Sequence, residues 1–165
     1  MTNINIKASK FNTIISGINK KRDFWQSDTK PLLVKVLNRV KDEIGLDLIV
    51  QTIDARINHE SVHIQFKSKP SGISEKNGKG LKAYIKWGGG LTFNQMYNGE
   101  VHILVTYPFI DELVPPTKRM LLVRIGPDKI SEEYIHARVN NFLDEMLNWE
   151  IITSGNSIDD LVPVS

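Results

Sequence analysis

Polar side chains on two predicted strands have the spacing of an anion-binding surface. In segment 60–69 the apolar residues Val62, Ile64 and Phe66 alternate with polar ones, and segment 81–87 alternates in the same way. Alternate residues of a strand point to one face, and neighbouring strands bring such side chains to about 5 Å. The face would hold His63, Gln65, Lys67, Lys69, Lys82, Tyr84 and Lys86, of which His63, Lys67, Lys82, Tyr84 and Lys86 are the predicted binding residues. If the two strands are neighbours, the face can bind phosphate groups or an acidic partner; the alternative is a solvated face kept soluble by lysine.

A second arrangement suggests metal-dependent catalysis. Asp54, followed by Gln65-Phe66-Lys67, resembles a Gln variant of the nuclease pattern PD-(D/E)xK, in which carboxylates hold a divalent metal and the lysine steadies the attacking water. The proline before the first acid and the second acid are both missing. Asp54, Gln65 and Lys67 are therefore catalytic candidates, beside the alternative that strand alternation alone produces the outline.

Other site chemistries are excluded or unsupported by the sequence. The chain has no cysteine, which excludes disulfides, thiolate metal sites and cysteine nucleophiles. His59 and His63 would lie about 13 Å apart in an extended segment, so we predict no metal site. Phosphate-loop and dinucleotide motifs are absent, and no cofactor is expected.

The elements that position these residues follow from periodicity. Apolar residues recur at helical spacing in 11–18 and 33–44, which predicts two amphipathic helices joined by a connector at 24–28, with Asp28 or Thr29 as N-cap. The later expectations are strands over 49–57, 60–69, 81–87, 91–96, 101–107 and 120–125, a polar loop over 70–80, and a hairpin turn at Asn98-Gly99. We expect Gly88-Gly89-Gly90 to mark a bulge, a bend or the close approach of another backbone. The strand at 120–125 is nearly continuously apolar, so we expect it to be covered on both faces.

A closing helix is predicted after Ser131, a suitable N-cap, with a core-facing stripe of Ile135, Val139, Phe142, Met146 and Trp149. The economical fold is a two-layer α+β sandwich: two N-terminal helices, an antiparallel sheet of about five strands, and a C-terminal helix packed on one sheet face. The length of 165 residues suits one domain over 1–150, with a polar C-terminal tail over 151–165.

One segment resembles ubiquitin-conjugating domains and their inactive relatives, including RWD modules. The residues that carry the resemblance are Tyr97-Asn98-Gly99-Glu100-Val101, Tyr107-Pro108 and Pro115-Pro116. The chain has Gly126-Pro127-Asp128 in place of the family's histidine-proline-asparagine element, and it has no cysteine. The resemblance therefore implies a non-catalytic binding module without conjugating activity.

Charge is uneven along the chain. Residues 1–41 hold nine Lys/Arg and two Asp, a net charge of +7, whereas residues 127–165 hold two basic and eight acidic residues, a net charge of −6. The basic part predicts an acidic protein or other polyanion as partner, unless both ends are simply solvated faces. Neither a secretory signal nor an apolar run of membrane-spanning length occurs, so we expect a cytoplasmic protein without membrane contact. The sequence leaves the oligomeric state open.

Four functions stay open at this point. The leading interpretation is a non-enzymatic binding or protein-interaction domain that uses the basic sheet face or a cleft between the sheet and the closing helix. The alternatives are a carrier of small hydrophobic ligands with a cavity under Trp149, the non-catalytic module named above, and a metal-dependent nuclease centred on Asp54 and Lys67.

Overall fold

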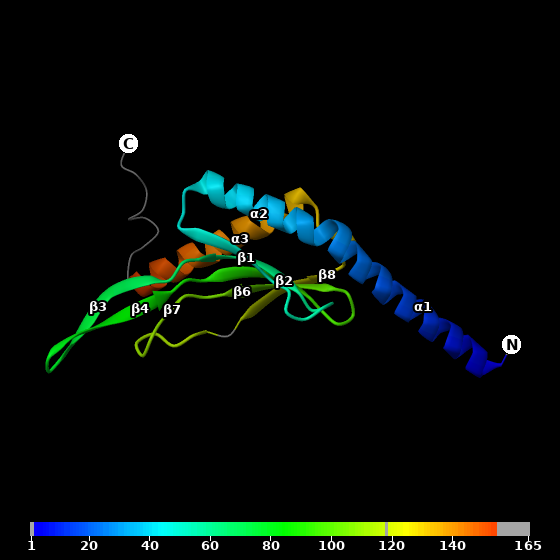
Figure 1. The fold of residues 1–165 in the computed structure, drawn as a ribbon, viewed down its shortest axis with the longest axis horizontal. Helices are drawn as coiled ribbons and strands as arrows, with labels where there is room; N and C mark the ends of the chain where they lie inside the picture. The colour runs from blue at the N-terminus through cyan, green and yellow to red at the C-terminus, as the bar shows by residue number, and fades with distance from the viewer. Residues whose placement is uncertain (1, 118, 155–165) are drawn as a thin grey trace.

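The computed structural model describes residues 2–117 and 119–154, which form an α+β fold (Figure 1). Its helical elements are α1 (Asn3–Phe24), the π-helix η1 (Trp25–Thr29), α2 (Lys30–Ile44), the 3-10 helix η2 (Pro127–Lys129) and α3 (Glu132–Ser154). Its strands are β1 (Leu48–Ile53), β2 (Ser61–Phe66), β3 (Lys69–Asn77), β4 (Gly80–Trp87), β5 (Gly90–Gln95), β6 (Val101–Thr106), β7 (Phe109–Ile110) and β8 (Met120–Ile125). No helix in these ranges has the length and apolar composition that crossing a bilayer requires.

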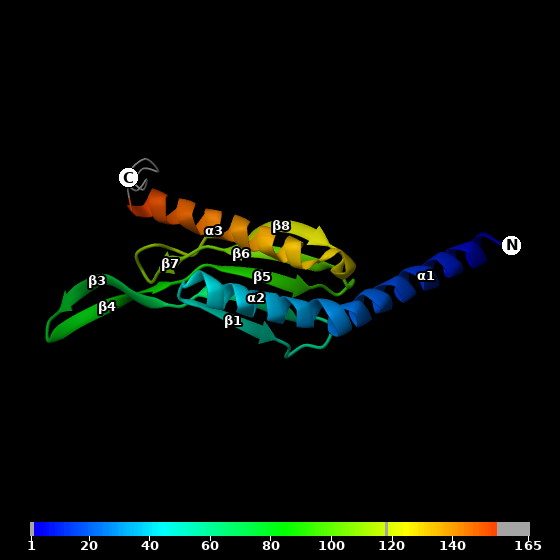
Figure 2. The ribbon, with the colours of Figure 1, turned by 90° about the horizontal axis from the view of Figure 1, so that it is seen from above.

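The main layer is a five-stranded antiparallel sheet in the order β1-β2-β5-β6-β8. Helices α2 and α3 lie side by side on one of its faces, α2 toward β1 and α3 toward β6 and β8 (Figure 2). This arrangement confirms the predicted two-layer sandwich, because the apolar stripes of both helices are buried against one sheet face. The buried core includes Leu33, Val36, Leu37 and Val40 from α2, Val62, Ile64, Leu91, Phe93, Val101, Ile103 and Val105 from the sheet, and Ile135, Val139, Phe142 and Met146 from α3.

The predicted loop over 70–80 is wrong. Residues Lys69–Asn77 form β3, which pairs with β4, and β4 pairs in turn with β7 to make a separate three-stranded sheet. Nearly all of β3 is exposed, so it has no apolar alternation from which a strand could be recognised. Its backbone pairing with β4 forms the strand instead, with an irregularity between Pro70 and Ser74.

Strand β8 also differs from its prediction. It was expected to be covered on both faces, but it is an edge strand that pairs only with β6 in the main sheet and is mostly half-buried.

The hairpin at Asn98-Gly99 is confirmed by the β5–β6 pairing. Only Gly99 of the two turn residues has a positive φ, at 79°, so the turn is not the two-residue type that the dipeptide favours.

No break separates the first two helices. The predicted connector at 24–28 is helical, because α1 continues through the π-helix η1 into α2, and neither candidate N-cap residue caps α2. The Thr29 hydroxyl instead donates a hydrogen bond to the Pro127 carbonyl oxygen at 3.0 Å. Helix α1 has no buried residue and projects beyond the sheet (Figure 1).

At the other end of the chain, α3 extends to Ser154, so the first residues of the predicted tail are helical and residues 155–165 lie outside the described part.

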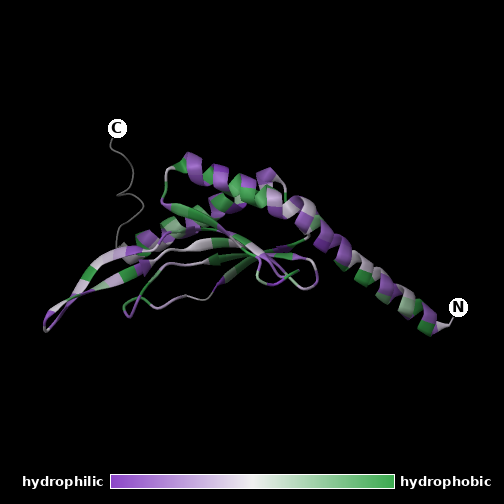
Figure 3. Ribbon diagram, in the orientation of Figure 1, coloured by the Kyte–Doolittle hydropathy of each residue, from purple (hydrophilic) through white to green (hydrophobic). Residues whose placement is uncertain are grey.

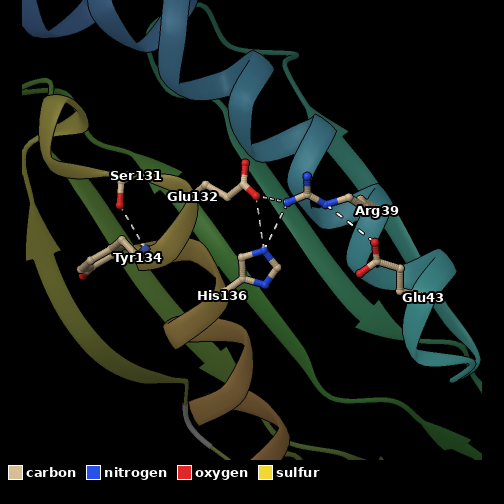
Figure 4. A network of polar contacts seen from close by, with 6 residues as sticks. All are labelled: Arg39, Glu43, Ser131, Glu132, Tyr134 and His136. Atoms are coloured by element: carbon tan, nitrogen blue, oxygen red, sulfur yellow. Dashed lines mark hydrogen bonds and ion pairs between the residues drawn. The ribbon is translucent and has the colours of Figure 1, made fainter.

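A polar cluster joins the two helices that cover the sheet (Figure 4). The Arg39 guanidinium on α2 hydrogen-bonds the Glu132 carboxylate at the start of α3, and one of its nitrogens lies 3.3 Å from Nε2 of His136. Ser131 caps α3 as predicted, since its Oγ accepts a hydrogen bond from the Tyr134 amide at 3.2 Å. These contacts hold the first turn of α3 beside α2.

A buried carboxylate joins η1 and the start of α2 to the sheet. Glu60, which precedes β2, accepts hydrogen bonds from Trp25 Nε1 at 3.3 Å, Gln26 Nε2 at 2.8 Å and Lys30 Nζ at 2.7 Å. Its carbonyl oxygen accepts the Gln95 amide at 2.7 Å. Burial by itself would raise the pKa of Glu60, but these side-chain hydrogen bonds outweigh burial and hold the pKa below its ordinary value of 4.5.

Replacing Glu60 with Gln should lower the free energy of unfolding by about 2 kcal/mol at neutral pH, because Lys30 loses its buried anionic partner. Since the folded pKa is lowered, the contribution of Glu60 is fully present above pH 4.5 and is lost as pH falls through the folded pKa. Urea unfolding at neutral and acidic pH should therefore show a parent–variant difference that shrinks in acid. The control is Glu43→Gln, an exposed carboxylate in a 3.9 Å ion pair with Arg39, which should change stability by less than about 0.5 kcal/mol.

Candidate functional site

An apolar pocket of about 370 Å³ lies between the second half of α3 and the place where the two sheets meet. Its apolar lining comes from Leu46, Phe66, Pro108, Leu143, Met146 and Leu147, together with the backbone of Gly88 and Gly89. Charged residues line it as well: Asp47, Lys67, Lys69, Lys86 and Glu150. The pocket combines an apolar interior with a few polar groups, which is typical of sites for small organic ligands.

The glycine run makes this pocket possible. A Cβ on Gly88 would overlap the Phe66 carbonyl group, and a Cβ on Gly89 would lie 2.7 Å from the Thr106 carbonyl oxygen and overlap Met146. The Phe66 amide donates a hydrogen bond to the Gly89 carbonyl oxygen at 3.0 Å, which ties the run to β2. The chain can therefore pass from β4 in the small sheet to β5 in the main sheet directly beneath α3, as expected for a close backbone approach.

The lysines of the pocket differ in their partners. Lys67 forms an ion pair with Asp47 at 2.8 Å. Lys86 pairs with Glu150, and its Nζ lies 4.8 Å from the centre of the Trp149 ring. Lys69 faces Lys86 across the β3–β4 ladder and has no ion pair within the described residues. Three lysines and two carboxylates leave the lining with a formal charge of +1.

The predicted basic face is not one surface, because the two strands that were to share it are not neighbours. Strand β2 lies between β1 and β5, whereas β4 lies between β3 and β7 in the other sheet. Lys82 pairs with Glu112 at 2.6 Å, and the Tyr84 hydroxyl donates a hydrogen bond to Glu75 at 2.6 Å, both in the small sheet. Of the predicted binding residues, the pocket brings together Lys67 and Lys86.

His63 points away from the pocket. It alternates with the core residues Val62 and Ile64 and is 8% exposed, with its Nε2 3.0 Å from Gln51 Oε1 on β1. Burial, together with the positive charge of Arg119, lowers the pKa of His63 below its ordinary value. The structure therefore places a largely uncharged imidazole here at neutral pH.

The three catalytic candidates are spread along the β1–β2 pair. Asp54 follows β1 next to the Ile53–Ser61 end of the ladder, is exposed, and lies 3.9 Å from Lys30. Gln65 is opposite Ile49, and Lys67 follows β2 beyond the Leu48–Phe66 end. Asp54 and Lys67 thus lie at opposite ends of the ladder, and residues 2–117 and 119–154 contain no group of three or more metal-binding side chains. The geometry gives the nuclease interpretation no support.

Sequence reasoning anticipated a cleft between the sheet and the closing helix but missed most of its residues. Leu143, Leu147 and Glu150 lie beside the core stripe of α3, and no local pattern distinguishes them from ordinary surface positions. Trp149, under which a cavity was expected, does not line the pocket but contacts Lys86 from outside. The triple glycine was the signal that could have located the site.

Replacing Gly88 with Ala should destabilise the protein by about 2 kcal/mol, because the new methyl group must displace the Phe66 backbone. Gly80→Ala is the matched control: a Cβ there has nothing within 4 Å, so we expect a change within about 0.5 kcal/mol. Both values can be read from urea unfolding followed by tryptophan fluorescence. Equal stabilities of the two variants would contradict a close backbone crossing at Gly88.

Comparison with protein-family models, with curated proteins and with solved structures found no match to this chain. The resemblance to ubiquitin-conjugating and RWD domains therefore rests only on residues 97–101, Tyr107-Pro108 and Pro115-Pro116.

Proposed function

We propose that this protein is a non-enzymatic binding domain that carries a small amphipathic ligand, with an apolar body and one anionic group, in the pocket between the sheet and α3. The observation that carries the proposal is the combination of an apolar interior with a lysine in the lining, Lys69, that forms no ion pair among residues 2–117 and 119–154. This is the carrier alternative from the sequence, moved from beneath Trp149 to the space beside Leu143 and Leu147.

The apolar body of the ligand would be held by removal of hydrocarbon from water. Leu46, Phe66, Leu143, Met146 and Leu147 offer aliphatic and aromatic surface on several sides of the pocket. Each CH₂ group buried there contributes about 0.8 kcal/mol. A medium-chain fatty acid suits a pocket of about 370 Å³ with such a lining.

The anionic group would be held where Lys69 and Lys86 face each other across the ladder. The Lys86 side chain is largely covered and already compensated by Glu150. No carboxylate in the described part of the chain pairs with Lys69, so it is the residue that an incoming carboxylate would pair with. Because Lys69 is exposed, the pairing should be modest in strength and sensitive to salt.

The lining favours binding over catalysis. Among the described lining residues, the carboxylates of Asp47 and Glu150 each form an ion pair with a lysine. None of these described residues is a histidine or carries a hydroxyl group that such a carboxylate could activate. A cytoplasmic location and an acidic protein or other polyanion as partner remain predictions from the sequence.

The direct test is calorimetric titration with dodecanoate. The parent should bind it, and Leu143→Trp, which fills the pocket with a large ring, should lose at least about tenfold in affinity. Leu81→Trp is the matched control, since Leu81 is exposed on β4 and outside the pocket. Absence of binding by the parent, or equal binding by the two tryptophan variants, would refute the proposal.

The role of the charge is tested separately. Lys69→Gln should weaken dodecanoate binding about two- to fivefold at low salt, with a smaller effect at high salt. Lys76→Gln, on the same strand but outside the pocket, should bind as the parent does. If both variants weaken binding equally, the effect comes from net charge and Lys69 is not the partner of the carboxylate.

A further inference from the structure

A seven-residue repeat runs along α1 into η1, and the fold buries only its last apolar member, Trp25. Apolar residues occur at Ile4, Phe11, Ile18 and Trp25, and each is followed by a side-chain amide, at Asn5, Asn12, Asn19 and Gln26. The apolar stripe steps by four and three residues through Ile4, Ala8, Phe11, Ile15 and Ile18. Such a repeat, sustained over the length of a helix, is the pattern that lets two helices supercoil around each other.

The stripe is open to solvent over most of its length. Ile4 is 77% exposed, Phe11 64% and Ile15 42%, and no residue of α1 is buried. Apolar residues alternate with polar ones along the part of α1 that projects beyond the sheet (Figure 3). Over residues 4–15 the rest of the described chain does not cover this stripe.

The β5–β6 turn of the same chain packs against the C-terminal part of α1, near Ile18. The Arg22 guanidinium donates a hydrogen bond to the Tyr97 carbonyl oxygen at 2.7 Å, and Lys21 lies 3.9 Å from Glu100. Gly99 in the β5–β6 turn has no room for a Cβ, which would lie 2.7 Å from Lys21 Cβ and 3.1 Å from the Ile18 carbonyl oxygen. A second helix on this stripe must therefore approach from the N-terminal end and stop before the β5–β6 turn.

We propose that the occupant is α1 of a second copy of this chain, packed antiparallel over residues 4–15. In an antiparallel pair, the domain of the second copy lies beyond the N-terminal end of α1, away from the first domain. In a parallel pair, the helix of the second copy would continue toward the β5–β6 turn and collide with it. In the register that matches the exposed segment, Ile4 lies opposite Ile15 of the second copy, and Ala8 lies opposite Phe11 of the second copy. The small Ala8 leaves room for the large Phe11 ring, so the stripe is complementary to itself.

Charge does not specify this pairing, because segment 4–15 carries two lysines, Lys7 and Lys10, and no acidic residue. In the same register Lys7 lies nearest Ile14 of the second copy, so it does not face Lys7 of that copy. Lys20, Lys21 and Arg22 lie outside the paired segment. An anionic lipid surface is the competing occupant of a basic amphipathic helix, but binding to lipid requires one apolar face and not a strict seven-residue repeat. The repeat favours a helix as partner.

The overlap is short. Twelve residues of helix, from 4 to 15, span about 18 Å. Short helix pairs are marginal on their own, so the dimer should dissociate in the micromolar range. Sedimentation velocity of the full chain over a concentration series should show a reversible monomer–dimer equilibrium. A chain that stays monomeric throughout the series would overturn the proposal.

Phe11→Asp should raise the dissociation constant at least tenfold, because it puts a carboxylate into the apolar seam. Thr13→Asp is the matched control: it adds the same charge to the exposed opposite side of α1 and should leave the constant within about twofold of the parent. Circular dichroism checks that both variants keep their helix content. Dimerisation of Phe11→Asp at parental strength would place the interface elsewhere and overturn the proposal.

Cross-linking tests the orientation, and the absence of native cysteines makes it clean. A mixture of Ile4→Cys and Ile15→Cys should form disulfide-linked heterodimers under mild oxidation, and Ile4→Cys alone should not. Efficient self-linking of Ile4→Cys would show parallel pairing and overturn the antiparallel arrangement. Cosedimentation of the parent with anionic phosphatidylserine vesicles, without dimer formation in their absence, would assign the stripe to lipid instead.

Discussion

The carboxylate of Glu60 is buried where η1, the start of α2, β2 and β5 meet, and the positions of α2 and α3 over the sheet depend on it. Trp25, Gln26 and Lys30 on η1 and α2 donate to its side chain, and the Gln95 amide donates to its carbonyl oxygen. A buried charge is tolerated only when it is paired and fully hydrogen-bonded, so these donors cannot move independently of the sheet. The hydrogen bonds of Glu60 hold the start of α2 over β1 and β2. Helix α2 in turn positions the first turn of α3 through the contact between Arg39 and Glu132.

The same hydrogen bonds of Glu60 also set the direction of α1. Because helix geometry continues without a break from α1 through η1 into α2, the orientation of α2 also orients the projecting helix. The π-helix inserts its extra residue where Trp25 and Thr29 turn into the core. The apolar stripe is thus covered by the domain from Trp25 onward and left open before Ile18.

The pocket and the projecting helix lie at opposite ends of the main sheet. The pocket is formed by the second half of α3 and the junction of the two sheets, whereas α1 extends away from the other end (Figures 1 and 2). Two copies paired through α1 would leave both pockets open. Ligand carriage and self-association are therefore structurally compatible and can be separated by experiment.

The sequence by itself determined the elements that have a regular apolar period. Helix α2, helix α3 with its Ser131 cap, and the alternating strands β2, β5 and β6 all follow from spacing, because one apolar face leaves one repeating pattern of apolar residues. It also excluded every cysteine-based chemistry and marked Gly88–Gly90 as a place of close approach. Strand β3 could not be predicted from the sequence, because both its faces are exposed and its pairing depends on the backbone of β4.

Only the tertiary structure decided which strands are neighbours, and with them the site. Lys67 and Lys86 share a pocket because the two sheets meet beneath α3, while Lys82 and Tyr84 lie apart in the small sheet and His63 is buried on the far face. Asp54 and Lys67 are close enough in sequence to suggest one centre, but they lie at opposite ends of the antiparallel β1–β2 pair. Alternation along a strand tells which side chains share a face, but long-range pairing places that face in the molecule, and no local pattern encodes it.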